Sequence, residues 1–342
     1  MSAPPPSPTS TWGAIAQGNG LVSIGTVALP PVGPHDVIID VSYAGICGSD
    51  LHGIDQSGTL GFTPGHEFSG VVSGVGGGVD GVGIGDRVAV LPRLACGRCR
   101  SCRRSDPVHC TNYIRTQPGG WAAQVVRDVN FLRPVPASVS LRDAALTEPL
   151  SCALWAVEKG AVTAGDTVVV LGGGSIGLMA SVLSMRSGAA QVLVSEPRAE
   201  RRRTAALLSL PSVDPTTQDA RAAVDALTGG FGADVVIEAV GSAAVVEEAL
   251  AMVKRGGRVV VAGVASPGDT MSLDVYDLFA RELTISGAWG VEATFQRSLE
   301  LLPYLPTDDL VSDVFPLEEV QQAVDLARQG SSGKVMLQIG ED

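Results

Sequence analysis

Two patterns in the sequence predict an α/β protein with two domains. One domain is all-β and barrel-like, and the other is built on a doubly wound parallel sheet. Up to about Leu154, short strand-like runs are separated by Gly and Pro turns, as in β barrels. After Trp155, strand-like and helix-like runs alternate, as in parallel sheets covered by helices. The expected strands are Val37–Val41, Gly70–Val75 and Arg87–Val90, then Thr167–Leu171, Gln191–Ser195, Asp234–Val240, Arg258–Val264 and Leu283–Gly287.

Helical periodicity follows two of these strands, at Ile176–Ser187 and Ala243–Val253. From about Trp289 the pattern resembles a return to the first domain, with one long helix and a final strand at Lys334–Ile339. The predicted boundaries place residues 1–154 and 290–342 in the first domain and residues 155–289 in the second.

The composition suits a globular α/β chain and argues against other classes. The 342 residues allow two domains, and with 45% hydrophobic but only 4% aromatic residues the core must be aliphatic. A net charge of −12 disfavours nucleic acid and anionic membranes as partners. Thr167–Met185 is uncharged and as long as a membrane helix, but three glycines interrupt it, which predicts a buried strand and helix instead.

The first residues, MSAPPPSPTS, are rich in Pro and Ser and lack the basic start and apolar run of a secretory signal. We therefore expect a loose leader before the first strand. We also expect a cytoplasmic protein, in which thiols stay reduced and disulfides are disfavoured.

A glycine pattern marks a candidate dinucleotide site. Gly172, Gly174 and Gly177 form GxGxxG directly after a predicted strand. The first glycine permits a tight turn, the second lets the backbone approach a pyrophosphate, and the third allows close helix–strand packing. Glu196 ends the next strand, 24 residues after Gly172. A carboxylate there accepts hydrogen bonds from the ribose hydroxyls and repels a 2′-phosphate, which favours NAD over NADP.

Four nearby arginines keep NADP open as an alternative, because arginine can pair with a 2′-phosphate. Such a charge run is more often a solvated helix face. The four are Arg198, Arg201, Arg202 and Arg203. Further candidate cofactor contacts are Ser175 and Ile176 at the predicted helix start, and Val240, Gly263 and Val264 near the ends of later strands.

Four cysteines, Cys96, Cys99, Cys102 and Cys110, lie within 15 residues and are interspersed with arginines. Four thiolates at this spacing can wrap one tetrahedral Zn²⁺ and leave no open position, which is typical of a structural site. The arginines would offset the charge of a zinc tetrathiolate. An iron–sulfur cluster is the alternative, but the fourth cysteine is not in the ferredoxin position. Structural zinc is therefore predicted.

A second set of metal ligands is spread over three segments. Cys47 lies in GICGSDLH, His66 and Glu67 lie in PGHEF, and Glu148 lies in TEPL. Together they offer one sulfur, one nitrogen and two oxygen donors. A catalytic zinc needs three protein ligands and one open position, where an alcohol loses its proton near neutral pH and its alkoxide can expel hydride.

The order of these motifs resembles the zinc-containing branch of the medium-chain dehydrogenase/reductase superfamily. GICGSDLH, PGHEFSG, the four-cysteine loop, EPL and GGGSIG follow one another as in that family, and the resemblance covers nearly the whole chain. It implies a GroES-like catalytic domain with a zinc lobe at about residues 94–112, and a Rossmann domain. A cleft between them would hold nicotinamide over zinc, with two zinc ions per subunit.

The resemblance also implies roles for single residues. Cys47 and His66 match catalytic zinc ligands, and Asp50 matches the carboxylate that orients the ligand histidine. Ser49 matches the hydroxyl that relays the substrate proton, and His52 matches the outer end of that relay. Arg201, five residues after Glu196, stands where the family has a basic residue near the adenosine ribose.

Glu148 stands where simple alcohol dehydrogenases have a second cysteine, as in polyol, butanediol and threonine dehydrogenases. A secondary alcohol or polyol is therefore the expected substrate. Either Glu67 or Glu148 can be the third ligand, whereas Cys152 is expected to be a buried helix residue. Two short stretches, between His52 and His66 and between Thr111 and Phe131, shorten the rim of the cleft and suggest a cyclic polyol or a sugar-like alcohol.

The predicted activity is reversible, NAD-dependent oxidation of a small secondary alcohol or polyol to a ketone. A quinone or enone reductase is a second hypothesis, but such relatives lack the zinc ligands. A non-catalytic dinucleotide-binding protein is a third, opposed by Ser49 and His52 because a sensor needs no proton relay. The resemblance also implies a homo-oligomer, either a dimer paired through the strand near Leu283–Gly287 or a tetramer.

Overall fold

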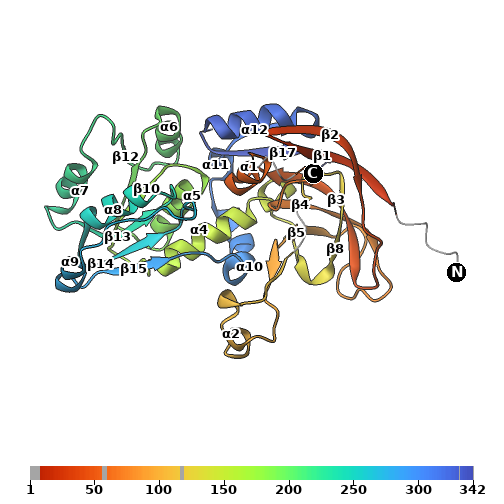
Figure 1. Cartoon of the computed structure of the whole chain (residues 1–342), viewed down its shortest axis with the longest axis horizontal. Helices are drawn as coiled ribbons and strands as arrows, with labels where there is room; N and C mark the ends of the chain where they lie inside the picture. Colours follow the sequence, from red (N-terminus) through yellow and green to blue (C-terminus); the bar gives the residue numbers. More distant parts are fainter. Residues whose placement is uncertain (1–7, 56–59, 116–118, 331, 342) are drawn as a thin grey trace.

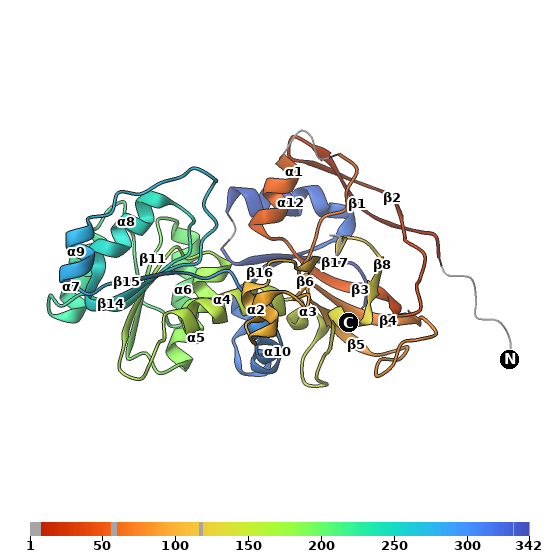
Figure 2. The same ribbon diagram turned by 60° about the horizontal axis from the view of Figure 1, so that its bottom comes forward.

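The structure, a computed structural model, describes residues 8–55, 60–115, 119–330 and 332–341. Most of the predicted leader, residues 1–7, lies outside this range. Figures 1 and 2 show a parallel sheet covered by helices beside a mainly antiparallel, β-rich part, with helix α4 between them. The predicted fold class is confirmed, while the exact domain boundaries stay a prediction.

The parallel sheet has the strand order β12-β11-β10-β13-β14-β15, and its strand pairs are all parallel. The order reverses between β10 and β13, so the carboxyl ends of these two strands open a crevice in which a ligand can bind. The strands are β10 (Thr167–Leu171), β11 (Gln191–Ser195), β12 (Ser212–Val213), β13 (Ala233–Glu238), β14 (Val253–Val261) and β15 (Thr284–Gly287).

Both faces of this sheet are buried, which explains its valine-rich strands. Val168 and Val170 belong to the core shared with α4 and α5, whereas Val169 and Leu171 pack in the core shared with α7 and α8. The uncharged segment that could be mistaken for a membrane span is β10 followed by α5, as predicted. The helices beside the parallel sheet are α4 (Thr147–Lys159), α5 (Ser175–Arg186), α6 (Ala199–Leu207), α7 (Ala220–Thr228), α8 (Ala243–Met252) and α9 (Val275–Ala280).

The β-rich part is centred on a sheet with the order β16-β17-β3-β4-β5-β9, to which β8 adds at β3. Strands before and after the parallel sheet therefore build one sheet, so the predicted return of the chain is confirmed (Figure 1). The strands are β1 (Ser10–Gly18), β2 (Leu21–Ala28), β3 (Asp36–Gly45), β4 (Phe68–Val75), β5 (Arg87–Val90), β6 (Arg93–Leu94), β7 (Ile114–Arg115), β8 (Gln124–Asp128), β9 (Leu132–Pro134), β16 (Val311–Pro316) and β17 (Lys334–Gln338).

The C-terminal segment differs from the prediction of one long helix. It forms α10 (Glu292–Leu301), α11 (Thr307–Leu310) and α12 (Val320–Gln329), with β16 between the last two. Pro303 and Pro306 end the first helix because proline has no N–H to donate to the helical ladder. The remaining helices are α1 (Gly48–Asp55), α2 (Arg100–Arg103) and α3 (Leu141–Ala144), with 3₁₀ turns at Pro107–His109, Val129–Phe131, Leu302–Tyr304 and Leu317–Glu319.

Two predicted strands end earlier than expected. β13 stops at Glu238 and β14 stops at Val261, so Val240 and Val264 lie in the loops that follow them. Gly241 and Gly263 lie in the same two loops. Within the described ranges, no helix combines the length and the apolar character required to cross a bilayer.

Candidate functional site

The candidate catalytic metal ligands gather where β3 ends and β4 begins. These strands are antiparallel neighbours with Ala44 opposite Phe68, so the residues just beyond each strand end are brought together. Cys47 follows β3, and His66 and Glu67 directly precede β4. Donor atoms of Cys47, His66 and Glu67 lie within 4.8 Å of one another. We call these three residues the catalytic metal group.

The Asp50 carboxylate, buried in the first turn of α1, orients this group. Its Oδ2 accepts a hydrogen bond from the Cys47 N–H at 3.0 Å, and its Oδ1 accepts one from the Gly65 N–H at 3.2 Å. The same Oδ1 lies 3.1 Å from His66 Nδ1. Burial alone would lower the pKa of His66, but the charge of Asp50 and its hydrogen bond raise that pKa well above its ordinary value. With Nδ1 engaged, Nε2 is left for a metal.

Glu67 is paired with a lysine that sequence reasoning missed. Its Oε2 contacts Nζ of Lys334, the first residue of β17, and the two residues are only 1% and 3% exposed. The contact is an ion pair rather than an aligned hydrogen bond, because Oε2 has no hydrogen-bond partner among the described residues. A lysine directly before the apolar run VML was the available signal, since buried lysines are usually paired.

Glu148 lies in the first turn of α4, as predicted, beside Pro149. It is buried, and no described cation lies within ion-pair distance of it. Burial raises the pKa of Glu148 to about 7, an effect that the charge of His66 opposes and that of Glu67 reinforces. Glu148 lies outside the 4.8 Å group that includes Glu67. Proximity therefore favours Glu67 as the third ligand, whereas the unpaired charge of Glu148 favours a cation nearby.

Cys152 packs against the core one turn after Glu148, as expected for a helix residue, but it is only partly buried. Its Sγ lies 3.9 Å from Glu148 Oε1. Burial raises the pKa of the Cys152 thiol well above its ordinary value, and the charge of Glu148 raises it further.

The two candidate relay residues lie on α1. Ser49 is exposed, and its Oγ donates a hydrogen bond to Cys47 Sγ at 3.3 Å. His52 is also exposed and follows Ser49 by three residues, so both lie on one face of the helix. The structure therefore places a hydroxyl against Cys47 Sγ and an exposed imidazole on the same face of α1.

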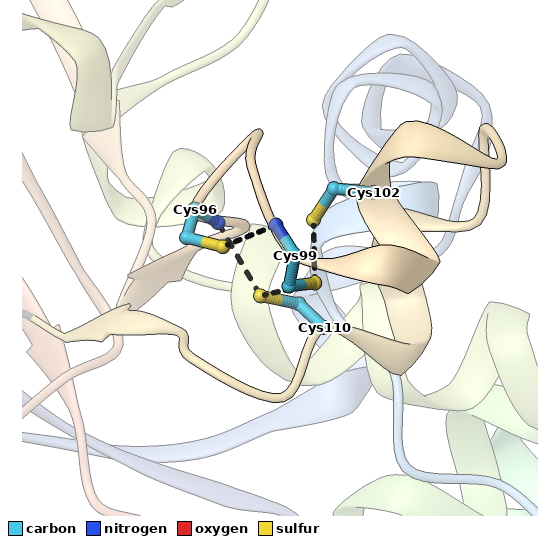
Figure 3. A group of neighbouring side chains, drawn as sticks. All are labelled: Cys96, Cys99, Cys102 and Cys110. Atoms are coloured by element: carbon cyan, nitrogen blue, oxygen red, sulfur yellow. Dashed lines mark hydrogen bonds between the residues drawn. The ribbon is translucent and has the colours of Figure 1, made fainter.

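The sulfurs of the cysteine loop point toward one another (Figure 3). Cys99 Sγ lies 3.4 Å from Cys102 Sγ and 3.9 Å from Cys110 Sγ, and the sulfurs of these three and Cys96 share one group within 4.8 Å. Tetrahedral zinc with bonds of about 2.3 Å requires sulfurs about 3.8 Å apart. Backbone N–H groups lower the pKa of the Cys99 thiol to about 5. All of the cysteines are free, so the loop fits a structural zinc ion.

The loop between β10 and α5 has the geometry of a dinucleotide cradle. Gly172 has a φ of 100°, and its N–H donates to the Ser195 carbonyl at 2.8 Å. A Cβ on Gly177 would lie 1.8 Å from the Gly172 carbonyl oxygen, so only glycine allows this packing. No side chain caps α5 at Gly174. The N–H groups of its first turn, which contains Ser175 and Ile176, are therefore open to a phosphate.

Glu196 lies beside this cradle at the end of β11, where it is 2% exposed. Its Oε2 accepts a hydrogen bond from the Gly173 N–H at 2.7 Å, and its Oε1 accepts one from the Arg198 N–H at 2.8 Å. Arg201 Nη1 lies 3.5 Å from Oε2. The carboxylate is thereby held at the position where the ribose of a bound dinucleotide is expected.

Two of the four arginines near Glu196 form ion pairs with acidic residues of this protein. Arg202 pairs with Asp214 at 2.9 Å, and Arg203 pairs with Glu200 at 2.9 Å. The Arg198 guanidinium donates to carbonyl groups at the end of α12. The arginine run is thus largely engaged within the protein, which weakens the case for a 2′-phosphate site.

The other side of the crevice is apolar. Val240 is 54% and Val264 is 73% exposed in the loops after β13 and β14. A Cβ on Gly263 would lie 2.0 Å from the Gly241 nitrogen, so these two loops touch. Glu238 braces them, because its Oε1 accepts hydrogen bonds from the N–H groups of Val240 and Gly241. Exposed valines at the carboxyl edge offer a surface for an apolar cofactor ring. Cradle and valines together fit a dinucleotide.

Comparison with known proteins matches two family descriptions to this chain. Residues 33–137 match "Alcohol dehydrogenase GroES-like domain", and residues 175–303 match "Zinc-binding dehydrogenase". The first region contains both predicted metal sites except Glu148, and the second contains the dinucleotide cradle apart from its first glycines. Each match agrees with the part of the fold on which it falls.

Three similar proteins cover most of the chain. The 2-dehydro-3-deoxy-L-galactonate 5-dehydrogenase of Pseudoalteromonas atlantica is 36% identical over 84% of this chain and 86% of its own. The sorbitol dehydrogenase of Bacillus subtilis is 31% identical over 94% and 95% of the two chains. A structure from Sinorhizobium meliloti 1021 with bound NADP superimposes with a TM-score of 0.89 at 30% identity, covering 97% of this chain and 100% of the other.

Proposed function

This chain belongs to the zinc-containing branch of the medium-chain dehydrogenase/reductase superfamily, and we propose on that premise that it interconverts a secondary alcohol or polyol and its ketone with NAD(H). The observation that carries the proposal is the catalytic metal group, whose three donors lie within 4.8 Å of one another. Sorbitol dehydrogenase and the galactonate dehydrogenase act, by name, on polyhydroxylated chains, which supports a substrate of that type.

Zinc held by the catalytic metal group would lower the pKa of a bound hydroxyl and stabilise the alkoxide from which hydride departs. Asp50 keeps the His66 ring in one orientation through its contact at 3.1 Å. Ser49, in contact with Cys47, is positioned to take up the substrate proton, and His52 to pass it to water. Glu148 supplies a second carboxylate toward the same site. A second zinc ion in the cysteine loop would be structural.

NAD is the proposed cofactor. A 2′-phosphate would lie against the Glu196 carboxylate, which is 2% exposed and held by two backbone N–H groups. Moving that carboxylate away would break both hydrogen bonds. We therefore expect Glu196 to stay in place and to repel the 2′-phosphate of NADP. The similar structure that binds NADP makes the opposite preference the outcome to test.

We also propose a homodimer formed through β15, the outer strand of the parallel sheet. An outer strand presents unpaired backbone groups to a second copy. Beside it, Tyr276 and Phe279 on α9 are 76% and 77% exposed. Light scattering that shows only monomers at micromolar concentration would contradict this assembly.

The decisive experiment uses the full chain loaded with zinc. Alditols, aldonates, cyclitols and simple secondary alcohols are supplied with NAD and separately with NADP, and formation of the reduced cofactor is followed. Turnover that disappears on removal of zinc supports the proposal. Reduction of quinones or enones by the zinc-free protein, with no alcohol oxidised by the zinc-loaded protein, would overturn it.

A further inference from the structure

A buried guanidinium lies against two aromatic rings at the junction of the two domains. Arg93, on β6, is 8% exposed. Its guanidinium carbon lies 3.8 Å from the centre of the Trp289 ring and 4.7 Å from that of Tyr113. Arg115 lies opposite Arg93 in the β6–β7 pair, and its guanidinium carbon is 5.9 Å from the Trp289 ring. Two cations therefore converge on one indole ring.

This junction lies beside the proposed reaction centre. Trp289 follows β15 by two residues, so it lies at the carboxyl edge of the parallel sheet, where the dinucleotide is expected. The next residue, Gly290, packs so closely on Trp155 of α4 that a Cβ would lie 2.8 Å from its ring. The same helix carries Glu148 in its first turn. Burial and Glu148 raise the pKa of the Cys152 thiol on this helix, and the charge of Arg93 opposes that rise.

Arg93 is short of polar partners. Its Nη2 donates to the Trp289 carbonyl at 3.3 Å, and its Nε is buried without a hydrogen-bond partner in the part of the chain that the structure describes. Within that same part, no carboxylate lies within the 4.0 Å of an ion pair. Glu292 is close enough to feel the charge of Arg93, but its Oε2 accepts a hydrogen bond from the Ala95 N–H at 2.7 Å instead.

A buried cation with an unpaired donor is costly unless an anion completes it. The rings of Trp289 and Tyr113, at 88° to each other, contact the Arg93 guanidinium from two directions, and its Nε is the donor left unpaired among the described residues. A guanidinium edge matches the two oxygens of a carboxylate or phosphate. In a protein with a net charge of −12, a local pair of arginines is also needed to attract an anionic ligand.

We propose that Arg93, assisted by Arg115, binds an anionic group of the substrate, so that this enzyme acts on polyhydroxy acids or polyol phosphates in preference to neutral polyols. The inference rests on the proposed function and adds a substrate class to it. Carboxylate and phosphate share the chemistry that the guanidinium recognises, and separate arms of the experiment distinguish them.

The experiment compares matched substrates on the zinc-loaded full chain with NAD. The set contains sorbitol and galactitol, the aldonates gluconate and galactonate, and the phosphates sorbitol 6-phosphate and galactitol 1-phosphate. We expect Arg93→Gln to lower kcat/KM for the preferred anionic substrate by about 10- to 100-fold, as for a lost hydrogen bond to a charged group. For the neutral alditols kcat/KM should change less than about threefold.

Two further variants test whether the effect of Arg93→Gln depends on the planar guanidinium and on this particular arginine. Arg93→Lys keeps the charge without the planar edge and should fall between wild type and Arg93→Gln. Arg133→Gln removes another arginine near Glu292, one that donates to the carbonyl groups of Asn130 and Leu132, and should leave both substrate types unaffected. Binding of each anion is measured separately through tryptophan fluorescence, because Trp289 contacts the guanidinium.

The outcomes separate the two proposals. Neutral alditols that are used as well as or better than both anionic sets, or an Arg93→Gln variant that loses both substrate types equally, would overturn the anion site while leaving the dehydrogenase intact. If no substrate is turned over, the proposed function fails. The anion site then stands only if an aldonate or phosphate binds wild type and not Arg93→Gln, and it falls if neither binds.

Discussion

Replacing Lys334 with Met is expected to destabilise the zinc-free protein by about 3–5 kcal/mol, the loss typical of breaking a buried ion pair. Met has nearly the same length, so the change removes charge rather than volume. The partner, Glu67, is 1% exposed, and its Oε2 has no hydrogen-bond partner among the described residues. Without Lys334, the buried carboxylate therefore has neither a cation nor water to stabilise it. For a chain of 342 residues that unfolds as a unit, this loss lowers Tm by roughly 4–7 °C.

The assay is thermal and denaturant unfolding of Lys334→Met, Glu67→Gln and the double variant. The double variant should recover about 1–3 kcal/mol relative to the sum of the single changes, because neither charge is then stranded. The chain supplies a matched control in Lys254, whose ion pair with Asp234 is more exposed at 39% and 18%. Lys254→Met should cost less than about 1 kcal/mol.

Two results would refute this reasoning. One is a Lys334→Met variant no less stable than Lys254→Met, and the other is a double variant whose loss of stability equals the sum of the two single losses. Zinc adds a further test, since a metal bound by Glu67 would replace the lost positive charge. The loss on Lys334→Met should then shrink in the zinc-loaded protein, whereas it stays constant if Glu67 is not a ligand.

The remaining predictions concern the two metal sites and the cofactor. Asp50→Asn should weaken zinc retention and kcat by about 10- to 100-fold, measured by chelator competition and turnover, because one side of its carboxylate becomes a donor facing another donor. Cys99→Ser should lower Tm and remove one of two zinc ions in elemental analysis, and an unchanged Tm with two zinc ions would exclude it as a ligand. Glu148→Gln should lower zinc occupancy and kcat about 10- to 100-fold, more than Cys152→Ser does, and the reverse order would redraw the ligand set. Glu196→Ala should shift the ratio of kcat/KM values from NAD toward NADP, and a wild type that already prefers NADP would disprove the assignment.

The dinucleotide cradle was predictable because its signals are local. Burial of both faces of β10 and β11 demands continuous apolar runs, and the predicted bounds of these strands, Thr167–Leu171 and Gln191–Ser195, agree with the structure. Gly177 is required by a contact only five residues away in the chain. The cysteine loop is local in the same sense, so its spacing already predicts that four sulfurs converge.

The ends of helices and strands were harder to predict from the sequence, and so were contacts between residues far apart in the chain. The predicted single C-terminal helix overlooked Pro303 and Pro306, although proline is a readable helix breaker. The ends of β13 and β14 were placed two and three residues too late, because apolar residues such as Val240 and Val264 continue past the strands to face the crevice. An apolar pattern does not distinguish a buried strand from a loop that presents its valines to a ligand.

By itself, the sequence determined the two kinds of sheet, the glycine cradle, the cysteine cluster and the set from which the catalytic ligands are drawn, because each depends on spacing along a short stretch of chain. Only the tertiary structure decided how distant charges are matched. It pairs Glu67 with Lys334, and it sets Arg93 against Trp289 and Tyr113 with no carboxylate of the described residues within ion-pair distance. Such pairs join strands that meet only in the folded sheet, and no periodicity along the chain records which buried charge will meet which partner.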